Sequence, residues 1–246
     1  QMAIEFKKTA VSGHFPEIWR GECKMLPGGF KPKNTIANGT VLHRGVLCEV
    51  HFEEMSAAVI KLAKVLNGGT TTKPRIAKGH LFAVGDVVAK YGKDDKSVTV
   101  SAIDTSNTEY DTLTLSAAIT GLSQNDVIIE SADYGYVDAA SGDEGALKIV
   151  ASEPSDGQIA LASVTPYLGE KTLAANDYVV LQTAGSKYTP NMVNVAVKEF
   201  NGKGLPTIDA ALEAVVLYPS LSFPVLPEWL NGCCLKSNPN ILFIKQ

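Results

Sequence analysis

Two groups of residues have types and spacings that could bind a metal ion or carry out hydrolysis. The first is the run Cys48-Glu49-Val50-His51. This run reads as a strand, in which positions three apart point to opposite faces, so Cys48 and His51 cannot share one zinc ion. The second group is acidic and consists of Asp86, Asp94, Asp95, Asp104 and Asp111. Segment 104–111 lacks the central glycine of an EF-hand loop, which favours a hairpin turn over a calcium site.

Paired carboxylates near an aromatic side chain are typical of sites that bind or hydrolyse carbohydrate. Such a site would use Asp94, Asp95, Asp104 and Asp111 with Trp19 or Trp229. The chain has no phosphate-binding loop, no dinucleotide-binding glycine motif and no nucleophile elbow, and its four histidines are scattered. The sequence therefore favours a protein that is not an enzyme and has no cofactor. A carbohydrate-binding or hydrolytic β-domain remains the alternative.

Composition narrows the class of protein further. The 246 residues are 45% hydrophobic and 20% charged, which is typical of a globular chain with its own core. A net charge of −4 and 7% aromatic residues disfavour a nucleic-acid partner. Charge is also unevenly distributed along the chain. Residues 1–100 hold 15 basic and 9 acidic side chains, whereas residues 101–246 hold 7 basic and 17 acidic side chains. The longest charge-free runs are too short to span a bilayer, so we expect no membrane partner.

The elements that must position these residues are mostly strands. Period-two runs at 97–103 and 112–115 predict strands, and 21 glycines with 12 prolines predict many turns. Gly85-Asp86, Asn125-Asp126 and Asn176-Asp177 each precede an apolar run, which predicts a turn with positive φ at the Gly or Asn. The fold class is therefore mainly β (α+β), with barrel- or sandwich-like antiparallel strands.

Two segments permit a helix. Thr207 has the properties of an N-cap with Asp209 in the first turn, and predicts one C-terminal helix near 207–218. Residues 53–66 permit either a helix or a hairpin, and we favour a hairpin with its turn near 53–56.

Three segments are expected along the chain: an N-terminal arm at 1–34, a β-rich core at 35–185 and a C-terminal α+β unit at 186–246. The arm has little periodicity but carries the anchors that interfaces prefer, so Phe15, Trp19, Arg20 and Phe30 are its expected partner-binding residues. The alternative is that the arm packs on its own domain. The N-terminus lacks a signal peptide, so synthesis in a reducing cytoplasm and four free cysteine thiols are expected.

Several segments of the sequence resemble head-fibre and capsid-decoration proteins of tailed bacteriophages and prophages. They lie at 35–47, at 78–86 (beginning Lys78-Gly79-His80-Leu81), at 102–106, at 110–115 and at 187–192 (beginning Lys187-Tyr188-Thr189). The resemblance implies a virion structural protein on the capsid surface, made in the bacterial host cytoplasm. Its implied partners are the phage major capsid protein and further copies of itself, as a homo-oligomer that is often a trimer. The arm would then dock on the capsid, and a host-surface glycan is left open as a ligand. A phage tail, baseplate or other capsid component is the alternative.

Overall fold

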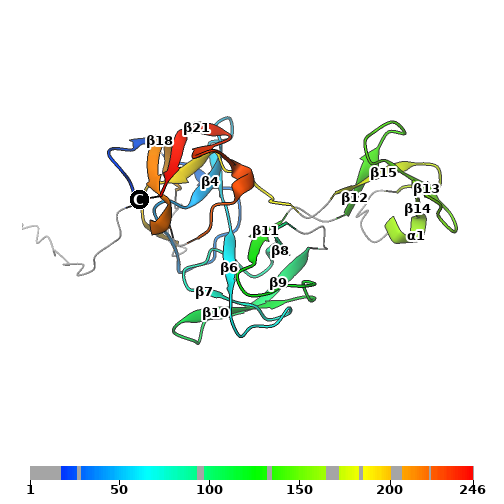
Figure 1. Ribbon diagram of the computed structural model, residues 1–246, viewed down its shortest axis with the longest axis horizontal. Helices are drawn as coiled ribbons and strands as arrows, with labels where there is room; N and C mark the ends of the chain where they lie inside the picture. Colours follow the sequence, from blue (N-terminus) through cyan, green and yellow to red (C-terminus); the bar gives the residue numbers. More distant parts are fainter. Residues whose placement is uncertain are drawn as a thin grey trace, which may run out of the picture.

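A computed structural model describes residues 18–26, 29–92, 97–131, 135–164, 172–182, 185–200, 207–221 and 223–245. The protein is mostly β, with 44% of residues in strands and 5% in helices, which confirms the predicted class. The strands form a large sheet, a closed barrel, a smaller sheet and a two-stranded ribbon (Figure 1). No helix in the described part of the chain is long and apolar enough to cross a membrane.

The large sheet joins strands from both ends of the chain. They are β1 (Lys24–Met25), β2 (Lys31–Pro32), β4 (Leu47–His51), β5 (Ser56–Val59), β16 (Met192–Asn194), β18 (Ala210–Leu217), β19 (Leu230–Asn231), β20 (Cys234–Leu235) and β21 (Asn238–Ile244). Their order is β19-β20-β21-β18-β16-β4-β5-β2, and β1 pairs with β18 as well. The expected segment boundaries near residues 34 and 185 therefore do not coincide with boundaries between sheets.

The helix predicted near 207–218 is wrong, because this segment is the strand β18. It pairs in parallel with β21 and antiparallel with β16 and β1, and most of its side chains are buried. A central strand covered on both faces has a nearly continuous apolar sequence, which cannot be told from a buried helix by periodicity. Short 3₁₀ turns follow at η2 (Tyr218–Ser220) and η3 (Pro227–Trp229).

The barrel contains six strands within the described residues. They are β6 (Leu62–Leu66), β7 (Arg75–Ala77), β8 (Val87–Lys90), β9 (Val98–Asp104), β10 (Tyr110–Leu115) and β11 (Val127–Glu130), closed in the order β10-β7-β6-β11-β8-β9. Alternate side chains of β10 point inward, as period-two patterning requires, and pack with Val65, Ile76 and Ile128. Closure leaves this sheet without free edges.

The predicted turns are confirmed. φ is 95° at Gly85, 72° at Asn125 and 82° at Asn176. In each turn the following aspartate accepts a hydrogen bond from the backbone N–H three residues earlier, at 2.7–2.8 Å. The preferred hairpin is confirmed as well, since β4 and β5 pair antiparallel across a turn at residues 52–55.

A smaller sheet is inserted between β11 and β16. It comprises β12 (Gly135–Ala139), β13 (Leu147–Val150), β14 (Gln158–Ala160) and β15 (Tyr178–Gln182), with the short helix α1 (Leu161–Val164). It has its own apolar cluster of Ile149, Ile159, Val164 and Val179. We call this part the distal module because it stands apart from the rest in Figure 1. The large sheet, the barrel and the ribbon of β3 (Thr40–Leu42) with β17 (Lys198–Phe200) form the body.

Candidate functional site

The strongest cluster of charged residues is buried where the large sheet meets the barrel. Its centre is Lys61, which lies between β5 and β6 and is fully buried. The Lys61 Nζ atom is 2.7 Å from both carboxylate oxygens of Asp86 and 3.9 Å from Oε2 of Glu130. Both carboxylates are almost completely buried as well. We call Lys61, Asp86, Glu130, Asn34 and Lys187 the polar junction.

Glu130 connects the remaining members of the junction. Its Oε2 accepts a hydrogen bond of 3.0 Å from Asn34 Nδ2, and its Oε1 lies 3.5 Å from Lys187 Nζ. Asn34 also bonds the backbone of Val59 through both ends of its amide. Burial raises the pKa of the Glu130 carboxyl above its ordinary value, and the positive charge of Lys61 opposes this shift.

The fold brings these residues together from separate elements. Asn34 follows β2, Lys61 marks the passage from sheet to barrel, Asp86 occupies the turn before β8, and Glu130 ends β11. Lys187 follows the point at which the distal module rejoins the body, where Ser131 and Ser186 form an antiparallel bridge. The Lys187 N–H also donates to the Glu130 carbonyl at 3.1 Å. The polar junction therefore ties the sheet, the barrel and the base of the distal module together.

A cleft of about 280 Å³ opens beside the junction, and its lining includes Lys33, Asn34, Asp86, Glu130, Lys187 and Tyr188. Of its two carboxylates, that of Glu130 lies 3.5 Å from Lys187 Nζ at the cleft, and that of Asp86 binds the buried Lys61 behind it. A buried ion pair that loses one partner is costly, because the remaining charge is left without compensation. The buried charges of this cleft are therefore bound to one another, and a ligand would have to displace these contacts. This arrangement is suited to holding parts of the molecule together.

The structure does not gather the expected partner-binding residues on one surface. Phe15 lies outside the described residues. Trp19 pairs with Val216 and packs against the apolar core of the large sheet, while Phe30 is 2% exposed and pairs with Ile208. Arg20 is exposed, and its backbone N–H donates to β18. From Ile18 onward the described part of the arm thus packs on its own domain.

The residues of the carbohydrate-site alternative also have separate surroundings. Asp94 and Asp95 lie outside the described residues. Asp104 is exposed and accepts a hydrogen bond from the N–H of Ser106. Asp111 is buried, 2.6 Å from Lys78 Nζ and 3.4 Å from His80 Nε2. Trp229 is buried in the core of the large sheet, and Trp19 packs against it.

The run Cys48-Glu49-Val50-His51 lies on β4, where positions three apart point to opposite faces, as expected for Cys48 and His51. Cys48 is buried and burial raises the pKa of its thiol to about 12, while His51 Nε2 lies 3.0 Å from Glu49. All four cysteines carry free thiols. In the described part of the chain, no three His, Cys, Asp or Glu residues come together as metal ligands.

Sequence reasoning missed most of the polar junction. Asn34, Lys61, Glu130 and Lys187 lie between 25 and 96 residues from the partners that they bind through side chains, and no motif links them. One signal was available. Lys61 is the single charged residue of the run Ala57-Ala58-Val59-Ile60-Lys61-Leu62-Ala63, and a lysine there needs a buried carboxylate partner.

Comparisons with protein-family models, with curated proteins and with solved structures found no match to this chain.

Proposed function

We propose that this protein is a non-enzymatic structural protein of the outer head surface of a tailed bacteriophage, a head fibre or capsid-decoration protein. The observation that carries the proposal is the polar junction, in which buried Lys61 joins sheet and barrel through Asp86 and Glu130, and the half-exposed Lys187 pairs with Glu130 at the base of the distal module. A body that holds a separate module away from itself suits a protein displayed on a larger particle. The resemblance of sequence segments between residues 35 and 192 to head-fibre and decoration proteins supports the same proposal.

The proposed partners are the phage major capsid protein and further copies of this chain. The large sheet ends in the short strands β19 and β2, and a sheet edge has unpaired backbone groups that a partner can cover. A trimer is therefore proposed on the basis of the sheet edges and the resemblance. The apolar run at 217–227 adds little, because Val225 and Leu226 are buried in the body.

The test is to add the purified protein to phage heads assembled without it and to sediment the heads. Co-sedimentation at a fixed ratio to the major capsid protein, with antibody labelling of the head in electron micrographs, is expected. Labelling of the tail or baseplate would replace the head assignment with the tail alternative. Light scattering that found only the 26.1 kDa monomer at micromolar concentration would contradict the trimer.

A further inference from the structure

The ion pair at the centre of the polar junction has a geometry from which a covalent bond can form. Lys61 Nζ lies 2.7 Å from both carboxylate oxygens of Asp86, and both side chains are buried. Two reacting groups held in contact can have an effective concentration of about 10⁵–10⁸ M, which promotes their condensation. Conversion of the pair to an uncharged amide also removes two charges from the interior of the protein, where charges are costly.

The backbone fixes both reacting side chains in this contact. Asp86 follows Gly85 in a turn, and its Oδ2 accepts a hydrogen bond of 2.7 Å from the Ala83 N–H. The Lys61 carbonyl accepts a hydrogen bond of 2.8 Å from the Glu130 N–H, which ties these two residues together. An N–H donor on a carboxyl oxygen stabilises the negative charge that develops there when the carboxyl carbon is attacked. The Ala83 N–H is placed for this role.

Glu130 is placed to carry a proton during such a reaction. Its Oε2 lies 3.9 Å from Lys61 Nζ and is held by Asn34 Nδ2 at 3.0 Å. Burial raises the pKa of the Glu130 carboxyl above its ordinary value, which suits a group that takes up a proton and returns it. Asp86 and Glu130 also line the cleft of about 280 Å³, through which a released water molecule can leave.

We propose that Lys61 and Asp86 condense after folding to form an isopeptide bond between Nζ and Cγ. A proton first passes from the Lys61 ammonium group to Oδ1 of Asp86, which leaves an amine and a carboxylic acid. The carboxyl group turns about χ2, a broad torsion, and the nitrogen lone pair forms the bond to Cγ. Glu130 takes a second proton from the nitrogen and delivers it to the Oδ1 hydroxyl, which leaves with its bonding electrons as water.

The reaction consumes no oxidant, reductant or other reactant. Its product joins the passage between the large sheet and the barrel to the turn before β8. The bond lies within one chain, so the inference and its test do not depend on the proposed function.

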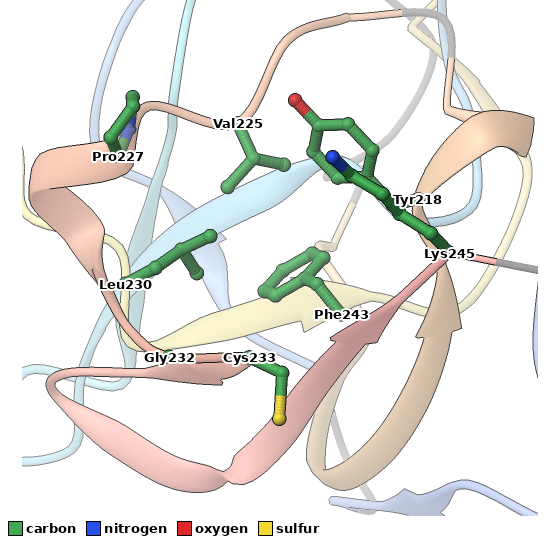
Figure 2. Close-up of a pocket in the computed structure, with 8 residues that line it drawn as sticks. All are labelled: Tyr218, Val225, Pro227, Leu230, Gly232, Cys233, Phe243 and Lys245. Carbon is green, nitrogen blue, oxygen red and sulfur yellow. The ribbon is translucent and has the colours of Figure 1, made fainter.

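Two other lysines each lack one of the features that Lys61 combines. Lys245 lies at a groove of about 570 Å³ with mostly apolar walls, and none of the eight lining residues drawn in Figure 2 carries a carboxylate. Lys90 Nζ lies 2.6 Å from Asp126 Oδ2, but both side chains are partly exposed, so water hydrates and screens the two charges. Of these three lysines, Lys61 alone has both a carboxyl partner and complete burial.

The first test is the intact mass of the denatured full-length protein, which should be one water molecule lighter than its sequence requires. After tryptic digestion, residues 45–64 should remain joined to residues 79–90, because trypsin does not cleave after an amidated lysine. This branched peptide distinguishes the isopeptide bond from a succinimide at Asp156-Gly157, which would also lose water.

Two variants test the reacting amine. Lys61→Met should have the full mass of its sequence. Lys90→Met is the matched control, because it removes the lysine of another short ion pair outside the polar junction, and it should still be one water lighter. A full sequence mass for the original protein, a water loss that persists in Lys61→Met, or a bond from Lys61 to Glu130 would overturn the proposal.

Glu130→Gln tests the proton transfer, since it keeps the shape of the side chain. Samples from cell-free synthesis would be quenched in acidic urea at intervals and weighed. Bond formation should be about 10²–10⁴-fold slower in this variant, while circular dichroism shows the same β-rich spectrum as the original protein. Equal rates would contradict the role of Glu130. If the variant does not fold, the mass of the original protein still decides whether the bond exists.

Discussion

At the scale of single residues, Lys61 is the position on which the body depends most. Replacing it with methionine keeps its length but leaves Asp86 and Glu130 buried without their main cation. We expect Lys61→Met to lower the free energy of unfolding by about 3–5 kcal/mol. The measurement is urea denaturation followed by circular dichroism. Lys64→Met is the control, because Lys64 is exposed on the adjacent strand and should change stability by no more than about 0.5 kcal/mol. Equal effects would show that Lys61 has no special role.

Glu130 makes stability depend on pH in a defined direction. Its pKa is raised above the ordinary 4.5, so between 4.5 and its native pKa the folded protein binds more protons than the unfolded chain. The stability that Glu130 contributes is therefore complete below pH 4.5 and is lost as pH rises through the native pKa. Glu130→Gln removes this titration. The unfolding free energy of the original protein minus that of the variant should fall with rising pH and then level off. A difference that rises with pH would contradict the raised pKa.

Met55 is a strained position in the β4–β5 turn, with φ of 49°. A left-handed conformation costs a residue with a side chain about 1–2 kcal/mol, and the Met55 side chain is 49% exposed. Met55→Gly relieves this strain but adds flexibility to the unfolded chain, so a net gain of about 0.5–1 kcal/mol is expected. Glu53→Gly in the same turn should instead lower stability. Thermal melts of both variants check the prediction, and a loss in Met55→Gly would refute it.

At the scale of elements, local chemistry explains which parts of the fold could be predicted. The turns at Gly85, Asn125 and Asn176 are set by neighbouring residues: one must adopt positive φ, and the following aspartate bonds the turn's own backbone. β18 was not predictable in this way. Thr207 has the chemistry of a helix cap, but β18 pairs with the N-terminal arm along one edge and with β16 and β21 along the other, and none of these partners is adjacent to it in sequence.

The same reasoning explains why the candidate site was missed. The polar junction exists only after β2, β8 and β11 have been placed beside Lys61, so its members have no common spacing. The arm shows the opposite case. Trp19 and Phe30 are residue types that interfaces prefer, yet in the described part of the arm Trp19 pairs with Val216 of β18 and Phe30 pairs with Ile208. Residue type alone does not say whether an apolar anchor serves its own domain or a partner.

The turn aspartates give a test at this scale. In the distal module, Asp177 is exposed and accepts the N–H of Ala174 at 2.8 Å. Asp177→Ala leaves that N–H without its acceptor and should cost about 0.5–1.5 kcal/mol. Asp177→Asn retains an acceptor oxygen and should recover more than half of the loss. Hydrogen exchange of the β13 and β15 amides reports the stability of this module. Equal exchange rates in Asp177→Ala and Asp177→Asn would show that the acceptor oxygen at residue 177 does not stabilise the module.

At the scale of the whole molecule, the distal module is an insertion whose two ends meet. Ser131 and Ser186 form an antiparallel bridge, and their Cα atoms in such a pair lie about 4.5–5.5 Å apart. The module's apolar cluster draws only on its own residues, while the body keeps separate cores in the large sheet and the barrel. We therefore expect the body to fold cooperatively without the module.

This leads to a deletion experiment in which Asn-Gly, the preferred two-residue hairpin turn, replaces residues 132–185 between Ser131 and Ser186. The Lys187–Glu130 and Lys61–Asp86 pairs stay in the shortened chain, so the body should unfold cooperatively with a Tm within about 5 °C of the full protein. Segment 132–185 carries eight acidic and two basic side chains, so the product should bind an anion exchanger less tightly. Loss of the cooperative transition would show that the body requires the module.

Adding Lys61→Met to the shortened chain should lower its stability as much as in the full protein, because the polar junction belongs to the body.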